Sequence, residues 1–460
     1  MAQQRSSLRT FYTLIITQVF SLIGSQMTGL AVGIWVYKET DNATPLAVAA
    51  FFSSIARVAA PSVAGVVADR WDRRRVMVLA DSGQAVGTLL LLISFLSGDF
   101  QLWHLYMVSF VSAVFGSFQD PAFQAATTML VPDEHRDRAN AIRQMTGPAA
   151  GIVAPALAGL LFSVMDATGV MIIDLFTFAV AMIVVWLSDI PRPKESAEGF
   201  LAKGSFWKET RVGFAYLLKR RPLFYLVCSV TLVNFFFTGV GVMFTPYILS
   251  LTDSEQTLGL LMSVMSAGAI TGGVIMSVWG GTRPRIHTTL PGIMFTAVFL
   301  MLYGVMRTPV TLGITMFLIM FPLPMINAAF MSIMQIKTPA DLQGRVFSAV
   351  MQVSMFFMPL GNLLAGPLID DVFEPAVGTQ YWYIVEPLVG SQAGSGMGLM
   401  AIICGAMMLL NTVIFYTIPN VRHMEAILPD YVAESSGVAE PDAVPGQDDE
   451  FETLTPAPVS

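Results

Sequence analysis

The chain has 460 residues, of which 54% are hydrophobic and 12% are charged. Soluble domains carry roughly 25% charged residues, so this composition excludes an ordinary soluble enzyme and predicts an integral membrane protein. The net charge of −7 owes much to eight acids between Asp430 and Glu452, in a stretch too poor in apolar residues to fold.

Apolar runs long enough to cross a bilayer, roughly 20 residues each, recur along the whole chain. The first run is much longer than a signal-peptide core, so we expect it to be retained. The runs lie at about 10–36, 45–68, 76–97, 103–130, 141–163, 169–188, 222–250, 258–281, 288–306, 309–336, 345–371 and 397–418. This order predicts an all-α membrane protein with twelve transmembrane helices in two pseudo-symmetric six-helix bundles.

The polar stretches divide these runs into domains. We expect an N-terminal bundle at 1–190, a cytoplasmic linker at 191–221, a C-terminal bundle at 222–420 and an acidic, disordered cytoplasmic tail at 421–460. Between the last two runs, 372–396 is expected to be an outer loop. Its Tyr381, Trp382 and Tyr383 form the kind of aromatic cluster that lies at the headgroup level.

Basic residues give an independent test of this topology, because Lys and Arg collect in cytoplasmic loops. With the N-terminus inside, 21 of the 25 basic residues fall on the cytoplasmic side. Only Lys38 and Arg307 fall outside, and Arg57 and Arg143 fall within spans. An error in the number of helices of either half would scramble this segregation, so we expect both termini to be cytoplasmic.

The two halves also repeat. A shift of 207 residues places Pro132 on Pro339 and Arg138 on Arg345. Both pairs lie in a polar loop that leads into an apolar helix, where chance similarity of two apolar stretches is a weaker explanation than duplication. Two parallel six-helix repeats are a recurring transporter plan, with the substrate site between them near the midplane.

The loop between the second and third spans carries a motif, G-V-V-A-D-R-W-D-R-R-R over 65–75. It resembles the signature of the major facilitator superfamily, in which a Gly is followed four residues later by an Asp and then by a basic cluster. The opening around Gln18, the segment from Pro121 to Pro132 and the ending from Val421 to Asp430 are similar to the branch that contains macrolide-efflux and enterobactin-export proteins.

The resemblance implies a secondary active transporter that exports amphipathic small molecules, drug-like or siderophore-like, by proton-coupled alternating access. It implies a monomer in a bacterial plasma membrane, whose partners are the substrate, protons and the lipid bilayer, without nucleic acid or a cofactor. Helix 5 carries a partial antiporter-like motif with Pro155 and Gly159, in which Ala replaces two expected Gly. The second-half counterpart of the loop motif, 280–285, lacks the acid.

The loop motif predicts a gate, made of Gly65, Asp69, Arg70, Arg73 and Arg74. The Gly permits close helix approach, and the Asp can be stabilised by the positive end of a neighbouring helix. The arginines can pair with acids such as Asp133 or Glu134 and hold the inner side shut in an outward-open state. The alternative is that they only set topology.

Ionisable residues within spans are costly and suggest function by default. The candidates for proton coupling are Asp120, Arg57, Asp81 and Asp174. We favour Asp120 as the proton site, with Arg57 as its partner, because Asp120 is the one acid near the middle of a span. Asp81 and Asp174 lie nearer the interfaces, where a structural role is favoured. A structural ion pair or cap is the alternative for the first two.

Polar, aromatic and flexible apolar side chains within the spans are candidates for the substrate cavity, because thioethers and aromatic rings suit varied apolar ligands. We expect the cavity to include Gln18, Asn234, Phe235, Asn327, Met331 and Met355. Packing or lipid contact is the alternative for the methionines.

The sequence also excludes several classes of function. It has no phosphate-binding Gly-x-x-x-x-Gly-Lys-Ser/Thr loop, and its four histidines form no metal-binding motif. Two alternatives to a transporter stay open: a transport-inactive receptor with the same helices, and a membrane-embedded enzyme, for which only scattered carboxylates are visible.

Overall fold

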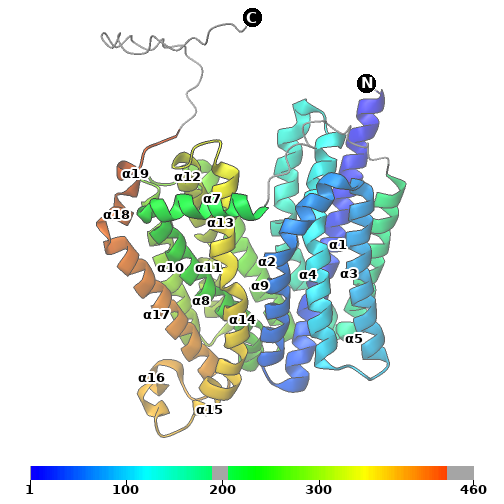
Figure 1. The fold of residues 1–460 in the computed structure, drawn as a ribbon. Coiled ribbons are helices and arrows are strands. Elements are labelled where there is room, and N and C mark those ends of the chain that lie inside the picture. The colour runs from blue at the N-terminus through cyan, green and yellow to red at the C-terminus, as the bar shows by residue number, and fades with distance from the viewer. Residues whose placement is uncertain (1, 189–205, 432–460) are drawn as a thin grey trace, which may run out of the picture.

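The computed structural model describes residues 2–188 and 206–431, with the side chains of 2–7, 61–63, 65–70 and 206–211 left aside. The described chain is helical, without a strand, and most helices run side by side (Figure 1). The short helices α18 and α19 lie at the same end as the N-terminus, and α15 and α16 lie at the opposite end (Figure 1). We call the end with α15 and α16 the distal end.

The N-terminal half contains five helical runs: α1 (Ala2–Thr40), α2 (Thr44–Arg70), α3 (Arg73–Leu96), α4 (Leu102–Leu130) and α5 (Arg136–Leu187). The last run is two helices joined at Asp166, whose φ of 59° and ψ of −177° are not helical. A carboxylate oxygen of Asp166 accepts a hydrogen bond from the Ala167 N–H at 2.7 Å. Asp166 therefore ends one arm and caps the next, and the two arms correspond to the predicted fifth and sixth spans.

The C-terminal half is more broken. Its long elements are α8 (Arg221–Thr252), α9 (Glu255–Trp279), α10 (Ile286–Val305), α11 (Pro309–Met320), α12 (Leu323–Ile336), α13 (Gln343–Phe356), α14 (Met358–Pro367) and α17 (Ser395–Thr417), with a π-helical turn at Leu368–Phe373. The breaks between α11 and α12 and between α13 and α14 fall beside Pro322 and Pro359, because Pro removes a helical hydrogen bond. Each of these helix pairs covers one predicted span.

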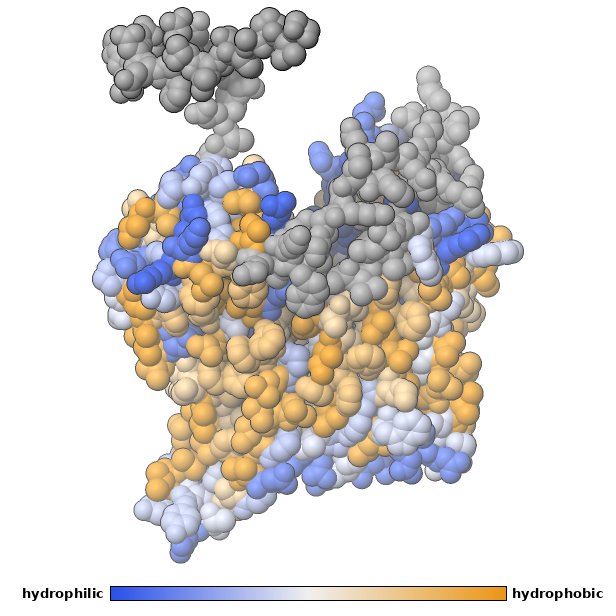
Figure 2. Space-filling view, in the orientation of Figure 1, coloured by the Kyte–Doolittle hydropathy of each residue, from blue (hydrophilic) through white to orange (hydrophobic). Residues whose placement is uncertain are grey.

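Nine helical runs of the described chain are long and apolar enough to cross a membrane, and one of them spans both arms of α5. The all-α fold is therefore confirmed, whereas the number of twelve crossings stays a prediction. Figure 2 shows a hydrophobic band across the middle of the molecule, with hydrophilic residues above and below it. This is the surface expected of a protein whose outer side chains face lipid.

Part of the predicted linker at 191–221 is folded. It contains helix α7 (Phe206–Lys219), which lies across the ends of its neighbours (Figure 1). The Tyr216 hydroxyl donates to the Lys337 carbonyl at 2.7 Å, and Gly213 fits against the backbone of Arg345. The last part of the linker is therefore packed onto the C-terminal half.

The tail is also folded further than expected. The predicted disordered segment begins at 421, but α18 (Pro419–Arg422) and α19 (Met424–Ile427) are helical, and Val421 and Met424 are fully buried. Burial of these apolar side chains holds the segment in place. We call 419–431 the C-terminal strap; residues 432–460 lie outside the described residues.

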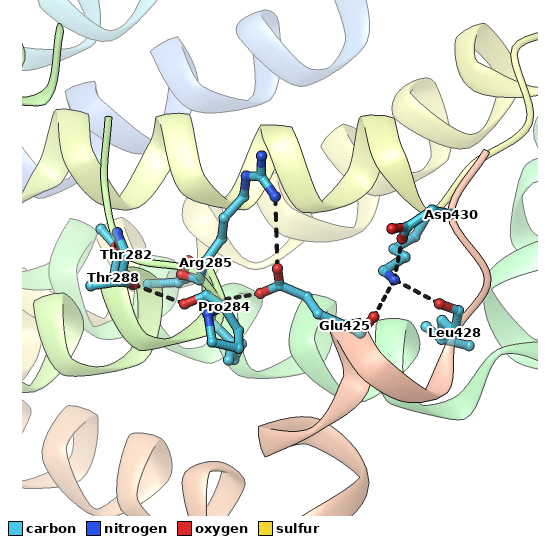
Figure 3. A network of polar contacts seen from close by, with 10 residues as sticks. Thr282, Pro284, Arg285, Thr288, Glu425, Leu428 and Asp430 are labelled. Carbon is cyan, nitrogen blue, oxygen red and sulfur yellow. Dashed lines mark hydrogen bonds and ion pairs between the residues drawn. The ribbon is translucent and has the colours of Figure 1, made fainter. Parts of the chain in front are cut away.

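Figure 3 shows polar contacts that fix the strap to two other segments. The Glu425 carboxylate accepts from the Ile286 N–H at 2.8 Å and lies 3.8 Å from the Arg285 guanidinium. The buried Lys337 ammonium donates to the carbonyls of Glu425 and Leu428 and to the Asp430 carboxylate. The strap thus joins the loops before α10 and after α12.

Replacing Lys337 with methionine is expected to destabilise the C-terminal half. Its ammonium satisfies two backbone carbonyls of the strap, and losing a charged donor to buried acceptors costs about 1.5–3 kcal/mol. The midpoint of thermal unfolding of the purified protein should fall, and limited proteolysis should cut the strap earlier. Lys219→Met, at an exposed position of α7, is the control. Equal midpoints for both variants would contradict the prediction.

The outer-loop prediction for 372–396 can be compared with the folded loop. It holds α15 (Glu374–Ala376), a short turn at Trp382–Ile384 and α16 (Glu386–Val389), all at the distal end (Figure 1). Tyr381 and Tyr383 are exposed, but Trp382 is buried and its indole N–H donates to the Gly390 carbonyl at 2.7 Å. The aromatic cluster is therefore divided: Trp382 anchors the loop, and the two tyrosines face outward.

Candidate functional site

Two helices of the N-terminal half present polar stripes toward the interior of their bundle. On α1, Gln18, Ser21, Ser25 and Thr28 share one face, and on α3, Asp81, Gln84 and Thr88 do so. Both sets follow the three- and four-residue spacing that keeps helical side chains on one side. The polar side chains of such helices must form their hydrogen bonds inside the protein, because lipid offers no hydrogen-bonding partners.

The first polar cluster surrounds Asp81, which is fully buried. The Gln18 amide donates to one of its carboxylate oxygens at 3.1 Å, and the Gln119 amide of α4 donates to the other at 2.6 Å. Gln119 also donates to the Gln18 side chain and accepts from Gln84 at 2.8 Å. The carboxylate is thus held by uncharged amides from α1 and α4.

The second cluster surrounds Asp174 on the second arm of α5, 1% exposed. Its oxygens accept from the Ser25 hydroxyl at 3.3 Å and from the Thr88 hydroxyl at 3.2 Å. Asp174, Ser25, Thr28, Thr88 and Gln84 also line a cavity of about 300 Å³ inside the N-terminal half. Because Gln84 borders this cavity and bonds to Gln119, the two clusters are linked.

Asp120 and Arg57, the pair favoured from the sequence, differ from Asp81 and Asp174 in their exposure. Both side chains are exposed, and they form no ion pair with each other in the described part of the chain. Asp120 follows Gln119 on α4, so its side chain points roughly 100° away from the Asp81 cluster. Asp81 and Asp174 are buried within the protein, whereas Asp120 is exposed, and the predicted position of the first two nearer the membrane interfaces stays a prediction. The coupling role of all four residues stays a prediction.

The expected substrate-cavity residues lie outside the 300 Å³ cavity, and their role stays a prediction. Gln18 joins the Asp81 cluster. Asn234 is partly buried and donates to the Ser354 carbonyl at 3.0 Å, while the neighbouring Phe235 packs edge-on against Phe236. The side chains of Asn327, Met331 and Met355 are exposed. None of the six borders the 300 Å³ cavity.

The loop gate can be compared with the structure only in part, because the side chains of Gly65, Asp69 and Arg70 lie outside the described residues. Arg74 donates to the Trp186 carbonyl and lies over the Trp186 ring. Asp133 pairs with Arg136 at 2.5 Å. In this conformation Arg74 therefore contacts α5 rather than an acid at the end of α4, and the gate stays a prediction.

The two halves meet at the distal end, in what we call the distal seam, formed by α5 with α9 and by α2 with α14. The hydrogen bonds between described residues of the two halves all lie in the distal half of these helices or in the turns that flank them. They join Lys38 to Glu255, Ser163 to Gln256, Ile152 to Ser263, Ala43 and Thr44 to Asp370, and Ala50 and Ser54 to Asn362. The molecule is therefore closed at this end.

Glycines make the first part of the seam possible. A Cβ on Gly159 would overlap the Glu255 carbonyl oxygen, and a Cβ on Gly259 would overlap the Pro155 carbonyl oxygen. Each helix thus needs a glycine where the other helix's backbone crosses it. Pro155 and Gly159, predicted as an antiporter-like motif, lie at the contact between the halves.

Replacing Gly159 with alanine is expected to open the seam, because overpacking costs typically 1–3 kcal/mol and separation of α5 from α9 relieves it. Disulfide formation between cysteines placed at positions 38 and 255 should slow by on the order of tenfold. Gly241→Ala is the matched control, since a Cβ there meets nothing within 4 Å. Unchanged cross-linking in Gly159→Ala would refute the role of this crossing.

The second part of the seam is a stripe on α14 and the following turn. Asn362 donates to the Ala50 carbonyl at 3.2 Å and to the Ser54 hydroxyl at 2.6 Å. Gly366 fits against Thr44. One turn further, the Asp370 carboxylate accepts from the N–H groups of Ala43 at 2.9 Å and Thr44 at 2.7 Å. A carboxylate of one half therefore caps the first turn of α2 in the other half.

The chain is similar in sequence to named export proteins. The chain is 25% identical over 392 residues to macrolide efflux protein A of Streptococcus pyogenes, covering 82% of this chain and 92% of that protein. It is 23% identical over 444 residues to an enterobactin exporter of Escherichia coli, covering 93% and 96%. These are the relatives of the branch that the sequence motifs indicated.

Solved structures share the fold at low identity. A bacterial homologue of the human lysosomal transporter Spinster matches with a TM-score of 0.69 and 14% identity, covering 89% of this chain and 96% of that one. A variant of the nucleoside transporter NupG matches with a TM-score of 0.70 and 13% identity, covering 90% and 100%. The model of the Major Facilitator Superfamily matches residues 14–362. The chain therefore belongs to the major facilitator superfamily and is a multi-pass membrane transporter with the fold that its loop motif predicted.

Proposed function

We propose that this protein is a proton-coupled exporter of amphipathic small molecules, working by alternating access in a bacterial plasma membrane with both termini in the cytoplasm. The observation that carries the proposal is the pairing of a distal seam between the halves with a buried acidic network inside one half. A seam of discrete contacts can open and close, and a buried carboxylate can take up or release a proton.

The distribution of basic residues supports one orientation of the protein in the membrane. The predicted loops at the end of the termini hold 21 of the 25 basic residues, whereas Lys38 and Arg307 lie toward the distal end. The positive-inside rule then makes the distal end the outer side. In this orientation the structure represents a conformation closed to the outside, and release of substrate requires opening of the distal seam.

The seam has the properties of a gate rather than of a permanent interface. Its hydrogen bonds and its closest backbone approaches, at glycines, lie in the distal half of the helices. Rigid halves can therefore rock about a central site, which is the usual motion of transporters built from repeats. The loop residues Gly65, Asp69, Arg70, Arg73 and Arg74 would form the opposite gate.

The buried acids supply the coupling. An intramembrane charge costs at least about 3 kcal/mol on insertion scales, and the described partners of Asp81 and Asp174 are uncharged amides and hydroxyls. Taking up a proton on one side and losing it on the other would tie their charge to the conformation. One proton crossing 100 mV provides roughly 2.3 kcal/mol, enough for a gradient of about 50-fold.

Transport by the purified protein in liposomes tests this function. With an imposed pH difference, acidic on the side of the distal end, we expect movement of a labelled macrolide against its gradient. Collapse of the pH difference by a protonophore should stop it, and liposomes without protein are the control. Substrate binding without any movement would instead favour a transport-inactive receptor.

A further inference from the structure

The cavity of about 300 Å³ in the N-terminal half lies between α1, α2, α3, α4 and the second arm of α5. Part of its lining is apolar, from Val32, Leu46, Leu91, Leu105, Val108 and Phe178. The polar part consists of hydroxyls, one amide and one carboxylate. This size and this mixture of many apolar and few polar groups are typical of small-molecule sites.

Asp174 is the one charged side chain among the residues that line this cavity. It is 1% exposed, and the two hydroxyls that donate to it do so at 3.2 and 3.3 Å, beyond the usual range for this kind of bond. A carboxylate offers about four acceptor sites, so capacity remains unused. The lining includes no Lys, Arg or His that could balance its charge.

We propose that this cavity binds the cationic head of an amphipathic organic ammonium compound, with Asp174 as the counter-ion. The proposal rests on the proposed export of amphipathic molecules and names their chemical class. A bare metal ion is disfavoured, since the cavity is much larger than an ion and one side of it is apolar. An ammonium group with small apolar substituents matches both the carboxylate and the apolar wall.

The position of the cavity would couple this ligand to the gate. Ala50 lines the cavity, and its carbonyl accepts the hydrogen bond from Asn362 across the distal seam. Gln84 lines the cavity on the other side and bonds to Gln119, which holds Asp81. A bound cation therefore contacts one helix of the seam and one member of the acidic network.

Gly29 offers a way to fill the cavity without disturbing its walls. It lines the cavity, and a Cβ added there would meet nothing within 4 Å. Gly29→Leu should therefore place a side chain in the space reserved for the ligand. Gly241→Leu is the matched control, because its position is equally open and lies outside the lining.

The test is calorimetric titration of purified protein in phosphatidylcholine nanodiscs with benzyltrimethylammonium and with N,N-dimethylbenzamide, an uncharged compound of similar size. The wild type should bind the cation about tenfold or more tightly than the amide. Asp174→Asn should lose that preference. Gly29→Leu should bind neither compound, and Gly241→Leu should behave as the wild type.

Three results would overturn the proposal: no binding of the cation by the wild type, an unchanged preference in Asp174→Asn, or wild-type binding by Gly29→Leu. If Asp174→Asn does not fold, the wild-type preference and the Gly29→Leu result still decide. Failure of this site is distinguishable from failure of the proposed function, because macrolide movement in liposomes is measured separately and without these compounds.

Discussion

Replacing Asp81 with asparagine is expected to abolish transport against a gradient while leaving downhill movement measurable. The amide keeps the shape of the side chain, and the neighbouring Gln18 and Gln119 can reorient their own amides to remain hydrogen-bonded. What the variant loses is the ability to change charge. Accumulation of up to about 50-fold, which one proton per cycle can support, should therefore disappear.

The measurement is substrate accumulation in proteoliposomes, with and without an imposed pH difference. Asp120→Asn is the informative comparison, since Asp120 neighbours Gln119 but its side chain is exposed. We expect a smaller loss in Asp120→Asn than in Asp81→Asn. Full uphill activity of Asp81→Asn, together with its loss in Asp120→Asn, would assign coupling to the exposed acid as the sequence alone suggested.

The fold was predictable because the apolar runs in the sequence that indicate its helices are long and repeated. Each apolar run predicted from the sequence lies in a helix or in a pair of helices broken at a proline, and the loop motif indicated the family that the comparisons confirm. The break at Asp166 was predicted as a gap between two runs. Such signals depend on composition over about 20 residues, so they tolerate errors at single positions.

The candidate site was harder to predict, because it depends on which way each side chain points. Position along a span favoured Asp120 over Asp81, but helical rotation places Gln119, not Asp120, beside Asp81. A usable signal was present, because polar residues repeat every three or four positions within apolar runs. They are Gln18, Ser21, Ser25 and Thr28 on α1 and Asp81, Gln84 and Thr88 on α3. A polar stripe of this kind indicates a shared interior face.

Contacts between segments far apart in the chain lay beyond the reach of the sequence. The acidic composition after 430 suggested disorder from 421 onward. In the structure, however, Val421 and Met424 are buried, and Lys337 donates hydrogen bonds to the strap. The motif with Gly159 was recognised, but its counterpart Gly259 carries no motif of its own. Complementarity between two distant helices is a property of the pair, so neither sequence alone reveals it.

Replacing Asp370 with alanine is expected to shift the protein toward the conformation open at the distal end. Among the polar contacts of the seam, Lys38 with Glu255 contributes little, because the lysine is 40% exposed and surface ion pairs are typically worth 0–1 kcal/mol. Asp370 accepts two backbone N–H groups at the start of α2, and hydrogen bonds to a charged group contribute about 1.5–3 kcal/mol. Its loss should change the ratio of closed to open molecules by about 10- to 100-fold.

Spin labels would report this change as a longer distance between positions 99, in the loop before α4, and 310, in the first turn of α11, after replacement of Cys228 and Cys404 by alanine. Both positions are exposed. Asp371→Ala is the matched control, since the neighbouring acid has an exposed side chain. Asp370→Asn should lie between the two variants, because its amide can accept at one oxygen but carries no charge for the helix end. A distance distribution in Asp370→Ala identical to that of Asp371→Ala would show that the cap does not hold the seam closed. The other contacts of the seam, among them the crossing of Gly159 with Gly259, would then hold it.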